Sequence, residues 1–166
     1  GGAWVTLFVL APPLTDDPWT LVTSVYAHAG VGHLLANALA LVLPGLVLER
    51  STSPLRYHAF FVSAGVVAGV AEVAFGGLVG TPSGVLGASG AVFAVIGYLL
   101  TSNRLTDAAV RGVSLSPRAQ LLLFAGLAVL VTIATGSPGV ALIAHFTGLL
   151  VGLLAGRAHL LRVAPA

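Results

Sequence analysis

The sequence contains no cysteine and no lysine, and charged residues make up only 7% of its 166 positions. Without cysteine, the chain can form neither a disulfide nor a metal site with thiolate ligands. Soluble domains carry about 25% charged residues, so this chain has too little charge to cover a surface in water. Together with a hydrophobic content of 57%, this shortage predicts an integral membrane protein.

Long apolar runs fill most of the chain, and a helix that crosses a bilayer needs about 20 mostly apolar residues. Five segments fit this pattern: 32–48, 57–78, 87–102, 119–135 and 140–156. A shorter run, 3–11, ends before Pro12 and Pro13. Because the chain begins with Gly-Gly and not with Met, we expect this run to be the end of a first helix whose start is missing. We therefore predict an all-α fold, a polytopic membrane helix bundle in which residues 1–166 form a single domain.

Two polar segments connect these runs. Residues 15–31 contain Asp16, Asp17 and Trp19, and we expect an interfacial loop with an aromatic anchor. Residues 101–118 are predicted to form a second polar loop.

The arginines predict the orientation of the bundle. The chain has seven, at positions 50, 56, 104, 111, 118, 157 and 162. If the segments alternate across the membrane, all seven fall on one side, which the positive-inside rule assigns to the cytoplasm together with the C-terminus. They form no single patch, so we expect no nucleic-acid partner.

Four of the polar residues inside the apolar runs stand out, because polar groups are costly there and by default indicate a functional site. Ser89 is flanked by Gly87 and Gly90, His145 opens the last run, and His33 and Asn37 are one helical turn apart. The runs that carry them all enter from the outer side, so topology puts them at a similar depth near the outer face. A serine, a histidine and hydrogen-bond donors are the parts of a serine hydrolase.

Small residues predict how two of these runs pack. They recur as Gly90, Ala94 and Gly97 in one run and as Gly148, Gly152 and Gly156 in the other. Such faces allow membrane helices to approach closely, which would bring His145 towards Ser89. Taken alone, a glycine stripe indicates packing only.

Other interpretations remain open at this point. A serine in a membrane helix most often bonds its own backbone. Zinc could use His28, His33 and His145 as three ligands, although the chain has no H-E-x-x-H motif and this leaves Ser89 unexplained. A small transporter could use Glu72 in a proton relay, although no repeats are visible.

A set of ordered motifs resembles the rhomboid intramembrane serine proteases. It consists of Trp19, His28, His33 to Asn37, Glu49-Arg50, Gly87-Ala88-Ser89-Gly90, and Ala144-His145 with Gly148 and Gly152. The resemblance covers about residues 19 to 156. It implies a six-helix core, a Ser–His dyad without a catalytic aspartate, and no cofactor or metal.

The resemblance also implies roles for single residues. Ser89 would be the nucleophile and His145 the general base. The side chains of His33 and Asn37, with the Ser89 backbone N–H, would bind the oxyanion. Supporting positions would be held by His28, Gly87, Gly90 and Phe93, the last stacking near the base.

The implied substrates are transmembrane proteins, cut near the outer face of a cell membrane. One departure is that Thr20 follows Trp19 where many rhomboids have arginine, so lipid anchoring of this loop is expected to differ. A catalytically inactive rhomboid-like protein that binds membrane helices is an alternative. Such a protein would lack the serine or the base, and both are present here.

Overall fold

A computed structural model of the protein describes residues 2–80, 84–103, 115–136 and 139–162. The predicted all-α fold is confirmed for these residues, which form helices and no strand. The helices are α1 (Gly2–Phe8), α2 (Thr20–Tyr26), α3 (Val31–Glu49), α4 (Pro54–Phe75), the 3-10 helix η1 (Gly76–Val79), α5 (Ser89–Thr101), α7 (Pro117–Thr135) and α8 (Leu142–Arg157).

Five helices follow the predicted apolar runs, with ends that local chemistry explains. Helix α4 begins earlier than its apolar run because Pro54 occupies the first turn and the Ser53 side chain accepts a hydrogen bond from the Arg56 N–H at 3.3 Å. In the same way, Pro117 opens α7 and Ser116 accepts from the Ala119 N–H at 3.2 Å. Proline suits the first turn because it has no N–H that would be left unpaired there. The serine side chain accepts a hydrogen bond from one of the N–H groups that would otherwise be unpaired.

The helices differ in length more than the apolar runs suggested. Three are long and apolar enough to cross a membrane: α3, α4 continued by η1, and α7. Helices α5 and α8 are apolar but shorter, with 13 and 16 residues. These two short helices are also the most buried ones, since about half of their residues are buried.

The prediction of a loop over residues 15–31 was wrong for α2. This helix forms because Val25 is buried against Gly65 of α4. The loop also holds α1, since the Trp19 indole donates to the Thr6 carbonyl at 2.9 Å and Thr23 donates to the Leu7 carbonyl at 2.6 Å. Of the predicted polar loop 101–118, residues 104–114 lie outside the described residues, while its last two residues belong to α7.

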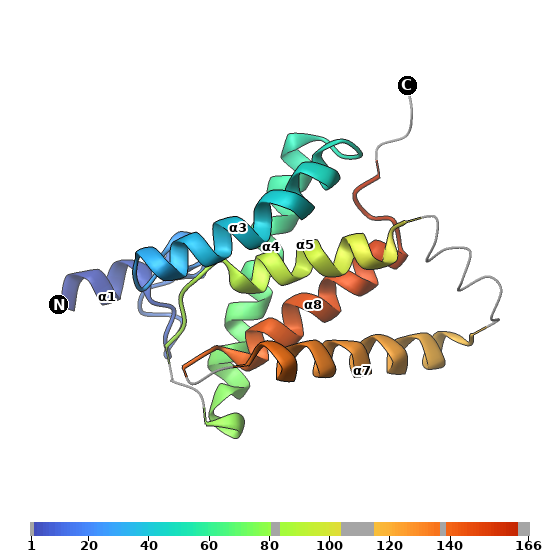
Figure 1. Ribbon diagram of the computed structural model, residues 1–166. Helices are drawn as coiled ribbons and strands as arrows, with labels where there is room; N and C mark the ends of the chain where they lie inside the picture. The colour runs from blue at the N-terminus through green and yellow to red at the C-terminus, as the bar shows by residue number, and fades with distance from the viewer. Residues whose placement is uncertain (1, 81–83, 104–114, 137–138, 163–166) are drawn as a thin grey trace.

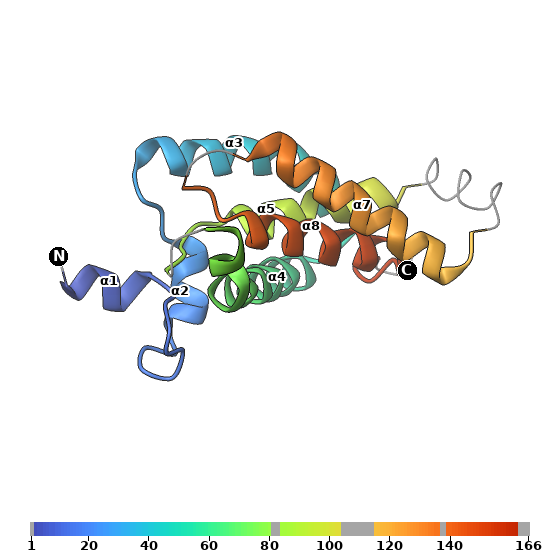
Figure 2. The same ribbon diagram turned by 90° about the horizontal axis from the view of Figure 1, so that it is seen from below.

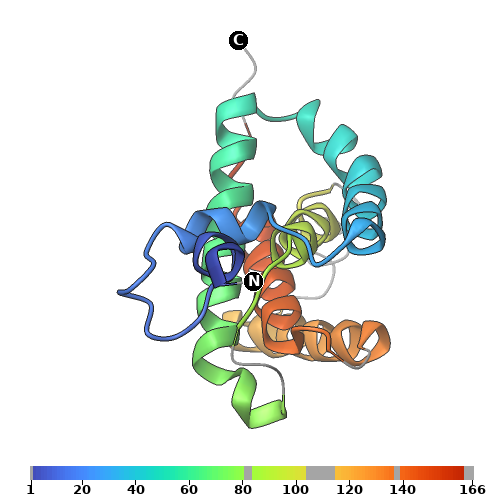
Figure 3. The same cartoon turned by 90° about the vertical axis from the view of Figure 1, so that its left-hand side faces the viewer.

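Helices α5 and α8 lie side by side in the middle of the bundle (Figure 1). Seen from below, α3 and α7 lie along one side of this pair and α4 with α2 along the other (Figure 2). The view from the N-terminal side shows α4 and α3 diverging from their connection, with α5 next to α3 and α8 next to α7 (Figure 3). The starts of α3, α5 and α8 lie at the same end of the bundle (Figure 1).

The interface between α5 and α8 is the most extensive in the structure and depends on glycine. Gly148, Gly152 and Gly156 pack against the backbone carbonyls of Gly90, Ala94 and Tyr98. A Cβ atom at any of the three α8 glycines would overlap those carbonyl oxygens. Thr101 adds a hydrogen bond across the pair, from its hydroxyl to the Leu153 carbonyl at 2.7 Å. This contact fixes the register of α8 against α5.

Candidate active site

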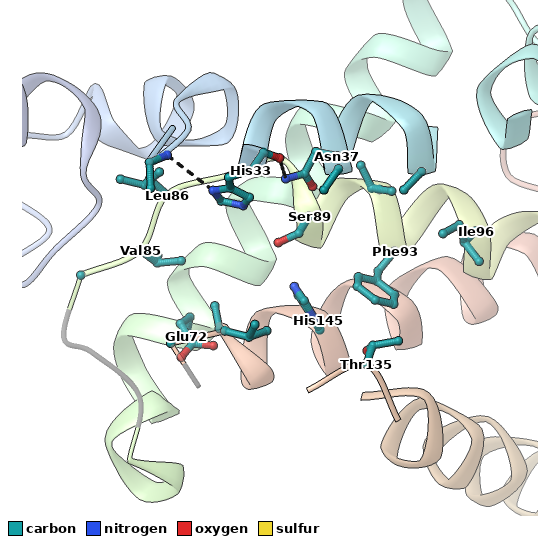
Figure 4. A pocket seen from close by; sticks show the side chains of 18 residues that line it. His33, Asn37, Glu72, Val85, Leu86, Ser89, Phe93, Ile96, Thr135 and His145 are labelled. Carbon is teal, nitrogen blue, oxygen red and sulfur yellow. Dashed lines mark hydrogen bonds between the residues drawn. The ribbon is translucent and has the colours of Figure 1, made fainter. Parts of the chain in front are cut away.

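One cavity of about 540 Å³ lies at the shared end of α3, α5 and α8. Its polar lining comes from residues far apart in the sequence: His33, Asn37, Glu72, Ser89, Thr135 and His145. Figure 4 shows the Ser89 hydroxyl and the edge of the His145 ring directed towards each other, with Asn37 and His33 on the opposite wall. The four residues singled out in the apolar runs therefore face one space.

Ser89 is the first residue of α5 and is half-buried. The first N–H groups of a helix have no partner inside it, and Ala88, at the N-cap, provides no side-chain cap. Gly87 holds the entry to this turn, with a φ of 127° and an N–H that donates to the Ser24 carbonyl at 2.9 Å. This backbone angle favours glycine.

His145 lies in the first turn of α8 and is buried, with 9% of its surface exposed. The Phe93 ring packs on it with a centroid distance of 4.4 Å and an interplanar angle of 37°. Phe93 follows Ser89 by one helical turn, so one face of α5 carries both residues that approach His145. The Nδ1 atom of His145 is buried and has no hydrogen-bond partner among the described residues. Packing, rather than a carboxylate on Nδ1, holds the ring there.

His33 and Asn37 lie on one face of α3. The Asn37 amide donates to the His33 carbonyl at 2.9 Å, and the Ala29 N–H donates to Nδ1 of His33 at 3.5 Å. An Nδ1 that accepts leaves the proton of a neutral imidazole on Nε2. That edge of the ring is packed so closely on Gly87 that a Cβ atom there would lie 2.7 Å from Cε1 and 3.0 Å from Nε2.

His28 supports this arrangement from behind the cavity. Its Nδ1 lies 3.0 Å from the Tyr26 carbonyl oxygen, and its ring meets the His33 ring edge to face at 5.1 Å. His28 lines a neighbouring apolar cavity and not the one that contains Ser89. Within the described ranges, no three His, Cys, Asp or Glu side chains are grouped so that they could hold a metal ion.

Comparison with known families assigns the chain. The family model described as "Rhomboid domain" matches residues 15–162. The chain belongs to the rhomboid family. This match includes every helix from α2 to α8 and all the residues that line the cavity.

Individual rhomboids give the same assignment. Rhomboid protease GluP of Bacillus subtilis is 35% identical over 89 residues, which are 52% of this chain and 17% of that protein. RHOMBOID-like protein 1 of Arabidopsis thaliana is 30% identical over 147 residues, 88% of this chain and 36% of that protein. Rhomboid-related protein 2 of Mus musculus is 34% identical over 103 residues, 57% of this chain and 32% of that protein.

This rhomboid chain thus aligns with about a sixth to a third of the length of these three curated relatives. No solved structure matches it. The family includes serine proteases and also inactive members, so the activity of this chain has to be argued from its own residues.

Sequence reasoning gave Glu72 a role only in the transporter alternative, whereas the fold brings this residue to the candidate active site. This α4 residue has only 2% of its surface exposed, and its carboxyl oxygen accepts a hydrogen bond from the Ala144 N–H at 2.8 Å. The available signal was a lone acidic residue in an apolar run, which marks a functional position by default. Its partner could not be predicted, because a backbone N–H leaves no trace in a sequence.

Proposed function

We propose that this protein is an intramembrane serine endopeptidase in which Ser89 is the nucleophile and His145 the general base. The observation that carries the proposal is the approach of these two side chains within one cavity (Figure 4). A serine hydroxyl is a weak nucleophile until a neighbouring base takes its proton. Membership of a family that includes serine proteases supports the assignment.

The reaction would proceed through an acyl-enzyme. Ser89 Oγ attacks the peptide carbonyl carbon as its proton moves to His145, and a tetrahedral oxyanion forms. His145 then gives this proton to the leaving amine as the C–N bond breaks. Water, deprotonated by the same ring, hydrolyses the ester and restores the serine.

The oxyanion would be bound by three donors around Ser89. These are the backbone N–H of Ser89, the second N–H of the Asn37 amide, and Nε2–H of His33. The first N–H of the Asn37 amide is already used for the His33 carbonyl, and an amide nitrogen has two to give. Removing one such donor typically costs roughly 10²–10³ in turnover.

The substrate would be a transmembrane segment of another protein. A helix of 13 residues rises only about 20 Å, less than the roughly 30 Å of hydrocarbon in a bilayer. Ser89, at the outer start of α5, would therefore lie below the membrane surface. A substrate helix would have to unwind locally to present a carbonyl, so we expect cleavage at helix-destabilising residues near the outer boundary.

The dyad is tested with Ser89→Ala, His145→Ala and the double variant, using gel-based cleavage of a transmembrane substrate in proteoliposomes. Each variant should abolish cleavage, and the double variant should be no worse than either, because residues that act as a unit are not additive. A fluorophosphonate should label the wild-type protein at Ser89. Cleavage that survives in Ser89→Ala would overturn the assignment.

A chelator arm separates this mechanism from zinc chemistry. Prolonged chelation should leave cleavage and labelling unchanged, because the proposed mechanism uses only side chains and backbone of this chain. Activity lost on chelation and restored by zinc would contradict the Ser–His mechanism.

We further propose that the protein resides in a cell membrane with its active site towards the outside and its C-terminus in the cytoplasm. The one-sided arginines support this orientation. Because the chain has no cysteine, a single cysteine introduced at Asp107 can be labelled without background. A membrane-impermeant maleimide should fail to label it in intact cells and succeed after lysis. Efficient labelling from outside would reverse the orientation.

A further inference from the structure

Glu72 is the one acidic side chain that is buried within the described part of the chain. It lies near the outer end of α4, and its carboxyl oxygen Oε2 accepts the Ala144 N–H of α8 at 2.8 Å. Ala144 directly precedes His145. A hydrogen bond from a different helix therefore ends one residue away from the proposed base.

This contact replaces a cap that α8 does not provide for itself. The third N–H of an α-helix is one that an N-cap side chain normally satisfies, and Ala144 is the third residue of α8. The N-cap position is occupied by Ala141, which makes no side-chain cap. Glu72 thus acts as the cap from outside, and its oxygen also lies where the helix dipole is positive.

We propose that Glu72 is a positioning residue for His145: it holds the first turn of α8 so that the base meets Ser89. The inference deepens the proposed function and rests on it. His145 makes no hydrogen bond through Nδ1 with the described residues, so its ring position depends on the Phe93 contact and on its own backbone. That backbone is held to α4 by the hydrogen bond between the adjacent residue, Ala144, and Glu72.

Glu72 also lines the cavity, so a second role has to be separated from this one. If its carboxyl group carried a proton to or from the site, the acid itself would be required. If it positions α8, the requirement is an oxygen acceptor at the right reach. Glutamine keeps that acceptor and reach without the acid, whereas aspartate keeps the acid and loses one methylene of reach.

The experiment compares Glu72→Gln, Glu72→Asp and Glu72→Leu with the wild-type chain in lipid nanodiscs. The matched control is Thr132→Val, which changes another buried polar side chain, one whose hydroxyl has no partner among the described residues. One measurement is hydrogen exchange of the backbone amides of residues 141–146. The other is the rate of fluorophosphonate labelling at Ser89 across a range of pH.

Positioning predicts that Glu72→Gln keeps both amide protection and labelling rate near wild type at every pH. Glu72→Leu and Glu72→Asp should expose the Ala144 amide to exchange and slow labelling at least about tenfold, because small misplacements of a catalytic group are costly. Thr132→Val should change neither measurement.

The reverse order of labelling rates among the Glu72 variants would overturn the proposal. An active Glu72→Asp beside an inactive Glu72→Gln would assign the residue to acid chemistry. Unchanged amide protection in Glu72→Leu and Glu72→Asp would show that Glu72 does not cap α8. If Glu72→Leu raises exchange throughout the bundle, that variant has lost its fold, and the comparison of Glu72→Gln with Glu72→Asp decides between positioning and acid chemistry. A wild-type protein that is not labelled at Ser89 would refute the proposed function, while the exchange data would still test the cap.

Discussion

The α5–α8 pair and helix α3 carry the two halves of the candidate site, and they are held in very different ways. Eight residues of α5 are buried, from a helix of 13. Only Asn37, Gly45 and Leu48 are buried in the 19 residues of α3. Ser89 and His145 therefore belong to the most tightly packed part of the protein, whereas His33 and Asn37 belong to a helix with few neighbours.

Side-chain size explains the difference. On α8, glycines allow the backbone of α5 to approach, and such close contact replaces the missing hydrophobic force between helices in lipid. On α3, long apolar side chains such as Leu39 and Leu43 are 73% and 74% exposed and suit contact with acyl chains. Ser89 and His145, the proposed nucleophile and base, thus have a rigid frame, while the proposed oxyanion donors rely on local contacts with Gly87 and Ala29.

The largest effect is expected from Gly152→Ala. Its Cβ would overlap the Ala94 carbonyl, so the α5–α8 pair would separate, at a cost of about 3 kcal/mol or more. Thermal unfolding in detergent should show a strongly lowered midpoint, with loss of Ser89 labelling. The matched control is Gly126→Ala in α7, where no atom lies within 4 Å of the added carbon, and helix propensity should stabilise the protein by about 0.5–1 kcal/mol. Equal effects of the two variants would contradict the difference in packing.

Asn37→Ala should affect turnover and not stability. Loss of one oxyanion donor should lower kcat by roughly 10²–10³ with a small change in KM, because the bond strengthens in the transition state. Its control is Asn103→Ala, since Asn103 also donates to the carbonyl four residues back, that of Leu99 at 3.0 Å, but lies outside the cavity. A variant that changes KM alone would assign Asn37 to ground-state binding.

Gly87→Ala should reduce activity less, by about tenfold, because the added carbon would push the His33 ring away from its place. Backbone strain at a positive φ would contribute as well. Gly80→Ala separates the two causes: Gly80 has a φ of 74° and open space around it, so this variant should lose stability and keep its turnover. If Gly80→Ala were equally inactive in the cleavage assay, strain would be the explanation and the His33 contact would not.

The smallest effect is expected from Leu43→Val on the exposed face of α3. Substitutions away from packed features usually change stability by no more than about 0.5 kcal/mol, and cleavage should be unchanged. A loss of activity here would mean that α3 is held by contacts beyond those of its three buried residues, and the contrast with α5–α8 would fail.

Periodicity and composition predicted the helical runs because membrane helices must be continuous and apolar. They did not predict α2, whose helix depends on burial of Val25 against Gly65, a contact between separate segments. The meeting of Ser89 with His145 could be anticipated from small residues at intervals of four. The capping of α8 by Glu72 could not, since it joins a side chain to a backbone group 72 residues away.

The spacing of the α8 glycines sets the steps by which α8 could shift along α5, and with it the alignment of the proposed dyad. Gly148, Gly152 and Gly156 pack against Gly90, Ala94 and Tyr98, and both sets recur every four residues. The next register in which the two sets could face each other is therefore four residues away. That shift is about 6 Å along the axis, far beyond the reach of a proton transfer. The proposed base and nucleophile are therefore aligned in one register of α5 and α8 and in no neighbouring one. We expect a gradual loss of function to come from displacement of α3 instead.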